Sequence, residues 1–138
     1  MSLYLADTSA WNRANATGAV AQRWSELLTA NEVAICLPVA LELLYSARGP
    51  SDYASLGDEL AGLTCLPLDL ETAARAARTQ AALAGKSQHR GPRPIDLLIA
   101  AIAEAHGAVL LHYDRHFEAI ARTTGQPTEW LARPGSIP

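Results

Sequence analysis

The chain has 138 residues, of which 49% are hydrophobic and 18% charged, and its formal net charge is -3. These values exclude a disordered chain and suit one domain with a real core. No apolar run reaches the ~18 residues of a membrane span, and Met1 to Asp7 lacks the features of a secretory signal, so we expect a cytoplasmic protein. Cys36 and Cys65 lie in apolar runs, which predicts two buried thiols rather than a disulfide or a metal pair.

Strands and helices alternate along the first half of the chain. Short apolar runs predict strands over residues 3–6, 33–37 and 64–66. Helical spacing, with Gly and Pro at the ends, predicts helices over residues 19–30, 39–48 and 51–63.

The second half is organised around the stretch from Pro94 to Asp114. Residues 95–105 are apolar almost all the way round, which predicts a helix buried on every side. Pro94 is a suitable start for this helix and Gly107 a suitable stop, and an apolar run then predicts a buried strand. The remaining predicted elements are a helix over 70–84 capped by Asp69, a loop over 86–94, the strand over 108–111, a helix over 115–123 and an edge strand over 128–131. This order indicates a three-layer α/β domain with a mainly parallel sheet.

Four acids interrupt or follow the apolar segments. They are Asp7 after the first strand, Glu42 on the helix after the second, Asp96 in the first turn of the central helix, and Asp114 after the strand that follows it. Ligand sites of parallel α/β sheets form beyond the carboxyl ends of the strands, where we expect these acids to gather. Each acid also has a structural explanation: a helix N-cap for Asp7 and Asp114, the helix dipole for Asp96, and a partly exposed helix position for Glu42.

Four carboxylates in one pocket repel one another strongly where the dielectric constant is low. Hard divalent cations relieve that repulsion, and oxygen ligands without a Cys/His set favour Mg²⁺ or Mn²⁺ over Zn²⁺. Such a site suits phosphodiester hydrolysis, because one metal lowers the pKa of a bound water and a second, ~3.5–4 Å away, stabilises the leaving oxygen. The acids therefore predict a metal-dependent phosphodiesterase.

A basic segment precedes the central helix. It contains Arg75, Arg78, Lys86, Arg90 and Arg93 with no acid among them. This segment indicates either a local anion site or a solvated helix face with a polar loop. We favour Arg90 and Arg93 as phosphate contacts because they are close in sequence to Asp96.

Other candidates for contacts to a nucleic acid lie beside the acids. His112 and His116 flank Asp114 and could contact such a substrate, although a structural or surface role is the simpler explanation. Trp11 follows the D-T-S turn and could stack on a base or pack in the core, and Trp24 is predicted to be core.

Four motifs carry a likeness to a known family: D-T-S after the first strand, L-P-V-A-L-E-L-L, R-P-I-D-L-L-I-A-A-I-A and Y-D-R-H-F. Together they resemble a PIN-domain ribonuclease and, more narrowly, the VapC toxins of bacterial toxin–antitoxin pairs. The likeness covers almost the whole chain, so we expect a single PIN-like nuclease domain over residues 1–138.

The resemblance implies an α/β/α sandwich and an Mg²⁺- or Mn²⁺-dependent endoribonuclease, for which we expect single-stranded or looped RNA as substrate. It also implies a homodimer and inhibition by a cognate VapB-like antitoxin. By matching motif positions, Asp7 and Asp96 are metal ligands, Glu42 and Asp114 complete the set directly or through water, and Ser9 supplies a nearby hydroxyl. The chain departs from the family at His112, where members often carry Ser or Thr.

Two other functions fit parts of the pattern. A small-molecule phosphohydrolase would use Asp7 as nucleophile, but that class usually has a second acid two residues on, where this chain has Ser9. A non-catalytic RNA-binding or interaction module with a decayed site is disfavoured because all four acids are present.

Overall fold

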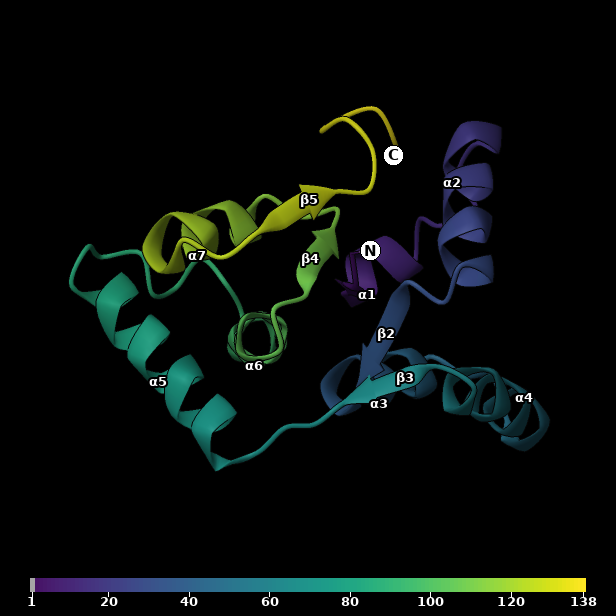
Figure 1. Cartoon of the computed structure of the whole chain (residues 1–138), viewed down its shortest axis with the longest axis horizontal. Coiled ribbons are helices and arrows are strands. Elements are labelled where there is room, and N and C mark those ends of the chain that lie inside the picture. Colours follow the sequence, from purple (N-terminus) through teal and green to yellow (C-terminus); the bar gives the residue numbers. More distant parts are fainter. Residues whose placement is uncertain (1) are drawn as a thin grey trace.

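The computed structural model describes residues 2–138, whose strands form one sheet in the order β3-β2-β1-β4-β5 (Figure 1). All neighbouring strands pair in parallel. The strands are β1 (Tyr4–Ala6), β2 (Val33–Cys36), β3 (Thr64–Leu66), β4 (Val109–His112) and β5 (Thr128–Trp130). Each coincides with a predicted strand to within a residue at either end, and β5 is an edge strand, as expected.

The helices also follow the predicted pattern, with one addition. They are α1 (Thr8–Trp11), α2 (Gly18–Thr29), α3 (Leu37–Tyr45), α4 (Pro50–Ala61), α5 (Leu70–Ala84), α6 (Pro94–Ala105) and α7 (His116–Thr124). The short helix α1 was not predicted as a separate element. Helix α3 begins two residues earlier than expected, because Pro38 is accommodated in its first turn instead of ending the preceding strand.

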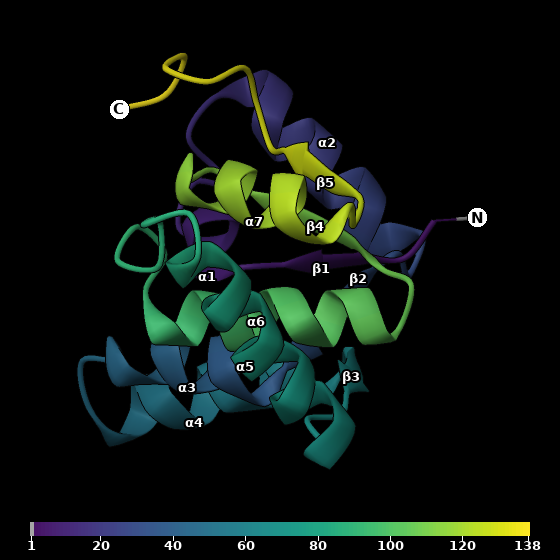
Figure 2. The same ribbon diagram turned by 90° about the vertical axis from the view of Figure 1, so that its left-hand side faces the viewer.

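The sheet is covered on both faces, which confirms the three-layer α/β/α arrangement. Neighbouring residues on one strand point to opposite faces, so Leu5 belongs to one hydrophobic cluster and Ala6 to another. The first cluster includes side chains from α3 to α7, and the second includes side chains from α1, α2 and the C-terminal segment. Figure 2 shows α5 and α6 in front of the sheet and α2 behind it.

Helix α6 is the central buried helix that the sequence predicts. Most of its side chains are buried, including Asp96, which is only 1% exposed. The alanine-rich helix α5 packs along it, since small side chains permit close approach. The helix ends at His106, and Gly107 follows with a φ of 64°, a left-handed conformation that glycine adopts without strain.

The cysteine prediction is half wrong. Cys36 is buried, and burial raises the pKa of its thiol to about 12. Cys65 is exposed, because β3 is the other edge of the sheet and its side chain lies outside the core. Trp11 and Trp24 meet edge to face at 4.8 Å within the second cluster, so both pack in the core. No helix within residues 2–138 is both long enough and apolar enough to cross a membrane.

Candidate active site

A pocket of about 570 Å³ opens at the carboxyl ends of β1 and β4, and three of the four predicted acids line it. Its acids are Asp7, Glu42 and Asp114. Asp96 lies beneath the lining and is linked to it through Arg93, which contacts both Asp96 and the pocket. The fold therefore brings together side chains that are far apart in the sequence, as expected for the edge of a parallel sheet.

Asp7 is held by the turn that follows β1. Its Oδ1 accepts a hydrogen bond from Ser9 Oγ at 2.7 Å and one from the backbone N of Ala10 at 3.3 Å, which makes Asp7 the N-cap of α1. Ser9 Oγ also accepts a hydrogen bond from the backbone N of Tyr113 at 2.8 Å. This hydroxyl therefore joins the end of β1 to the end of β4 and fixes the two adjacent acids relative to each other.

The carboxyl group of Asp7 has lost most of its solvent. Its side chain is 2% exposed, and burial raises its pKa from 3.8 to about 6, although hydrogen bonds from Ser9 and Ala10 oppose the shift. The negative charge of Asp96 adds to the rise. A nearby cation stabilises the ionised form of a carboxyl group that burial disfavours in this way.

Arg93 supplies such a cation to the other half of the site. Its guanidinium lies 3.3 Å from Glu42 Oε2 and 3.2 Å from Asp96 Oδ1, and its backbone N donates to Asp96 Oδ2 at 3.0 Å. Partial burial acts to lower the pKa of Arg93, but the charges of Asp96 and Glu42 outweigh burial and raise it. Thr8 Oγ1 donates to Glu42 Oε1 at 2.6 Å, so both oxygens of Glu42 are held.

Asp114 is the most exposed of the four acids, with 32% of its side chain accessible. Its Oδ1 accepts from the backbone N of His116 at 2.9 Å and lies 3.2 Å from Nδ1 of the same residue. The backbone N of Asp114 donates to His112 Nδ1 at 3.2 Å. The ring of His112 therefore holds the backbone of Asp114 in place. It stands where the family resemblance led us to expect the hydroxyl of a Ser or Thr.

The predicted RNA contacts divide into two groups. Arg93 lines the acidic pocket and His116 adjoins Asp114, so both are positioned to meet a substrate. Arg90 is exposed but does not line the pocket. Of the two explanations for His112, the structural one holds: the side chain is 0% exposed and packs against Phe117 and Trp130, so it has no surface for RNA.

The remaining basic residues favour the solvated-face explanation. Arg75 pairs with Glu71 and Glu104, and Arg78 pairs with Glu71. Lys86 donates to Thr123 at 2.7 Å. Arg75, Arg78 and Lys86 are therefore engaged by residues of α5, α6 and α7. Within the basic segment, Arg93 is the residue that contacts two of the four predicted acids, Glu42 and Asp96.

Sequence reasoning missed several residues of the pocket. Thr8, Asn12, Arg13 and Tyr45 all line it. Thr8 lies within the D-T-S turn and could have been chosen for its hydroxyl, as Ser9 was. The other three lie one helical turn from an acid or a hydroxyl of the site, but nothing in their sequence context marks them.

The oxygen ligands fit Mg²⁺ or Mn²⁺, since all four acids offer hard carboxylate oxygens and Asp7 is destabilised as an isolated charge. Within residues 2–138, no three His, Cys, Asp or Glu side chains are grouped closely enough to hold a metal ion. Arg93 already contacts two of the four carboxylates. A metal that used all four would therefore require the Arg93 side chain to move.

Comparison with known proteins places this arrangement in a wider group. Residues 4–123 match the PIN domain family. The chain is 44% identical to Ribonuclease VapC18 of Mycobacterium tuberculosis over 137 residues, covering 98% of this chain and 99% of the relative. It is 40% identical to Ribonuclease VapC51 of the same organism over 134 residues, covering 97% and 96%.

Solved structures share the fold. A DNA-bound VapBC complex from Salmonella typhimurium contains a chain that matches with a TM-score of 0.75 and 24% identity, covering 96% of this chain and 100% of that one. VapBC2 from Rickettsia felis, bound to a promoter DNA fragment, matches with a TM-score of 0.75 and 21% identity, covering 93% and 98%.

Proposed function

The chain belongs to the PIN domain family, and from this we propose that it is an endoribonuclease that hydrolyses RNA phosphodiester bonds in the acidic pocket. The observation that carries the proposal is the convergence of Asp7, Glu42 and Asp114 on one pocket, with Asp96 beneath it. Near full-length identity of 44% to a protein named a ribonuclease supports the same reaction. No other function is favoured by a specific contact: Asp7, at 2% exposed, is poorly placed as a nucleophile for a small phosphate ester.

We further propose Mg²⁺ or Mn²⁺ as the cofactor, held by Asp7 and Asp96 with Glu42 and Asp114 completing the set. Bound there, the metal would supply an activated water and neutralise charge on the phosphate. The protein prepares the site through its own residues. Ser9 orients Asp7, Thr8 orients Glu42, and the backbone of His116 fixes one oxygen of Asp114.

Asp114 is our candidate for orienting the attacking water. It is the most solvent-accessible of the four acids, whereas Asp96 is almost completely buried. A carboxylate that is hydrogen-bonded through one oxygen keeps its other oxygen free to accept a proton from water.

Arg93 is our candidate for binding the substrate phosphate. Its side chain is 60% exposed and its guanidinium already lies at the acids, where it can exchange a carboxylate for a phosphate oxygen. The Arg93→Ala variant should bind RNA more weakly and reduce the salt slope of binding by about one. Arg90→Ala is the matched control and should stay close to the wild type, because Arg90 is exposed and outside the pocket.

Fluorescence anisotropy with labelled single-stranded RNA at several salt concentrations measures both quantities. An Arg90→Ala, Arg93→Ala double variant with unchanged affinity and salt slope would remove both residues from RNA binding.

A role as the toxin of a toxin–antitoxin pair is also proposed. The structural neighbours include VapBC complexes, and one face of α3 carries exposed apolar side chains of the kind that a protein partner covers: Leu37, Leu41 and Tyr45, spaced four residues apart. Leu41 and Tyr45 also line the acidic pocket, so a VapB-like antitoxin on this face would reach the acids. A homodimer and a cytoplasmic location remain predictions.

The direct test is to sequence RNA ends after brief expression of the wild type beside the Asp96→Asn variant. We expect new ends that recur at defined sites in the wild-type sample alone. Identical RNA ends in both samples would contradict the ribonuclease proposal.

A further inference from the structure

A second cavity, of about 820 Å³, adjoins the acidic pocket and is larger than it. The two share Ser9, Arg13 and Asp114 in their linings. The residues that line the second cavity come from the ends of β4 and β5 and from the C-terminal loop that follows β5. The two cavities are therefore neighbours that meet at these three residues, so an RNA bound in the acidic pocket would have its adjacent nucleotide near the second cavity.

Two aromatic rings line the cavity. Tyr113 follows β4 and Trp130 ends β5, and both side chains are only half-buried. Their rings meet edge to face with centroids 5.4 Å apart. The guanidinium of Arg13 lies 5.0 Å from the centre of the Tyr113 ring. Partly exposed aromatic rings beside a guanidinium form the kind of surface on which nucleobases stack.

The rings are held in place from behind. The ring of Trp130 contacts that of the buried His112 at 4.8 Å. Arg23 on α2 donates to the backbone oxygens of Trp130 and Leu131, at 3.2 and 2.8 Å, and pairs with Glu129. The aromatic surface is therefore braced before any ligand arrives, which reduces the entropy cost of binding.

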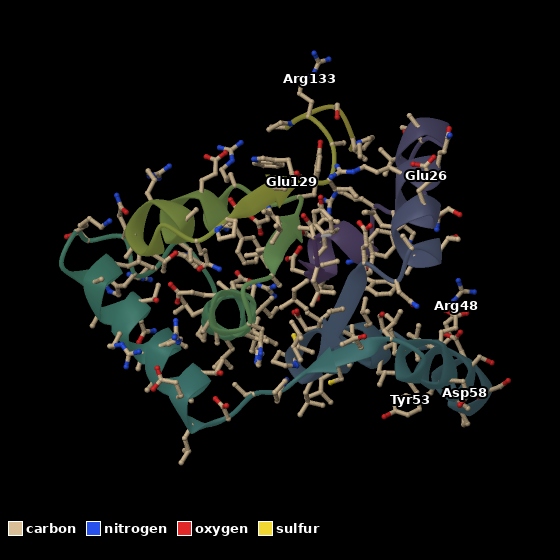
Figure 3. All side chains as sticks on the ribbon, in the orientation of Figure 1. Glu26, Arg48, Tyr53, Asp58, Glu129 and Arg133 are labelled. Atoms are coloured by element: carbon tan, nitrogen blue, oxygen red, sulfur yellow. The ribbon has the colours of Figure 1, made fainter. Side chains whose placement is uncertain are left out.

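The C-terminal loop adds a second brace. The hydroxyl of Tyr113 accepts a hydrogen bond from the backbone N of Ile137 at 2.8 Å, and Ile137 is buried. Figure 3 shows Glu129 on β5 and Arg133 on this loop, where the Arg133 side chain points away from the protein.

The polar side chains around the cavity suit a nucleotide rather than an apolar ligand. Arg13, Arg115 and His116 line it together with the acids Asp114 and Glu118. The two guanidinium groups can bind the phosphates of a nucleotide whose base stacks on an aromatic ring.

We propose that this second cavity is a nucleobase subsite, in which the base next to the scissile phosphate stacks on Trp130, whose ring Tyr113 meets at a right angle. The inference rests on the proposed ribonuclease function and extends it to how the substrate is held. It makes Trp130 a residue that positions the RNA beside the acids.

The experiment uses short single-stranded RNAs that contain a mapped cleavage site. In each RNA, one base beside the cleaved bond is removed, leaving the ribose and phosphate. We expect the wild type to cleave the RNA lacking the stacked base with kcat/KM lower by about tenfold, because stacking on an aromatic ring is lost. Removing a base at a distant position should have little effect.

Variants of the ring identify the partner of that base. Trp130→Leu should cleave intact RNA about tenfold less efficiently, with no further loss on the RNA lacking the base, whereas Trp130→Phe should retain most activity. Tyr53→Leu is the matched control, since Tyr53 is exposed on α4 far from the C-terminal loop (Figure 3). A Trp130→Leu protein that discriminates between the two RNAs as well as the wild type would overturn the proposal.

Binding separates this inference from the function on which it rests. In an Asp96→Asn background, RNA affinity is measured by anisotropy without cleavage. For this measurement the bases of one short RNA are removed one at a time, so no cleavage site needs to be known. Loss of affinity on removing one base supports the subsite even if the wild type cuts no RNA, in which case only the ribonuclease proposal fails. Equal affinity for all the RNAs would reject the subsite, whether or not Trp130→Leu folds.

Discussion

RNA cleavage by the Asp96→Asn variant will be slower than that of the wild type by at least about a hundredfold, with little change in fold. Asp96 is 1% exposed and lies in the first turn of the central helix α6, whose buried side chains fix its position. The amide keeps the size of the carboxyl group, and its oxygen can still accept a hydrogen bond from the backbone N of Arg93. What is lost is the negative charge that we propose as a metal ligand.

Asp58→Asn is the matched control for this substitution. It removes the same charge from an exposed position on α4 (Figure 3), and Asp58 does not line the acidic pocket. The rate of cleavage is measured with a fluorescent RNA, and circular dichroism checks the fold of both variants. A folded Asp96→Asn protein that cuts RNA at the rate of Asp58→Asn would exclude Asp96 from the reaction.

The Asp7→Asn variant should be more stable than the wild type at neutral pH without divalent metal, yet cleave RNA far more slowly. The pKa of Asp7 is raised from 3.8 to about 6 by burial, so the ionised side chain destabilises the folded state near pH 7. Removing the charge should raise the free energy of unfolding by about 1 to 3 kcal/mol. Asparagine still offers an oxygen to Ser9 and Ala10, so the turn after β1 should persist.

The pH dependence of stability provides a second signature. A raised carboxyl pKa means that the folded wild type loses stability as pH rises from 3.8 to about 6. His112 acts in the opposite sense, because burial lowers its pKa from 6.5 to about 4. The unfolded chain binds this proton first, so the contribution of His112 to folding stability is present above pH 6.5 and is lost as pH falls towards 4. In the wild type the two trends partly offset each other.

Asp7→Asn removes one of these trends and leaves the other. Its stability should therefore fall more steeply than that of the wild type on acidification from pH 6.5 towards 4. Urea unfolding across this range, with a chelator present, measures the difference. Parallel curves with no gain in stability at neutral pH would show that the Asp7 carboxylate is not destabilised by burial.

The sequence was sufficient to predict the layers of the fold and the neighbourhood of the acids. Helix α6 is apolar on all sides, so its burial followed directly from composition, and the parallel sheet followed from the alternation of elements. Asp7 and Asp114 both follow strands, so the rule that parallel strands end at one edge was enough to bring them together.

The detail of the contacts could not be predicted, because it depends on side-chain directions. Arg93 was chosen for its closeness to Asp96, but the sequence does not tell that its guanidinium also reaches Glu42 on a different helix. A structural role of an acid, such as capping a helix, also proved compatible with a place in the candidate active site. Asp7 caps α1 and Asp96 accepts from the backbone N of Arg93, while Asp7 also lines the pocket.

The misplaced residues share a physical cause. His112 was a candidate RNA contact and Cys65 was expected in the core, but His112 lies on a strand covered on both faces and Cys65 on an edge strand. Sequence alone does not give the position of each strand in the sheet. For the same reason it did not reveal the aromatic cavity, since Tyr113 and Trp130 meet only when β4 pairs with β5.

Titration of the purified protein with Mn²⁺, followed by isothermal calorimetry at neutral pH, tests the central claim most directly. We predict saturable binding to the wild type and to Asp58→Asn, and a loss of affinity of at least about tenfold in both Asp7→Asn and Asp96→Asn. Arg93→Ala should bind Mn²⁺ at least as well as the wild type, because its guanidinium no longer occupies two of the carboxylates. Absence of binding to the wild type, or an affinity in the two acid variants equal to that of the wild type, would contradict a metal site formed by these acids.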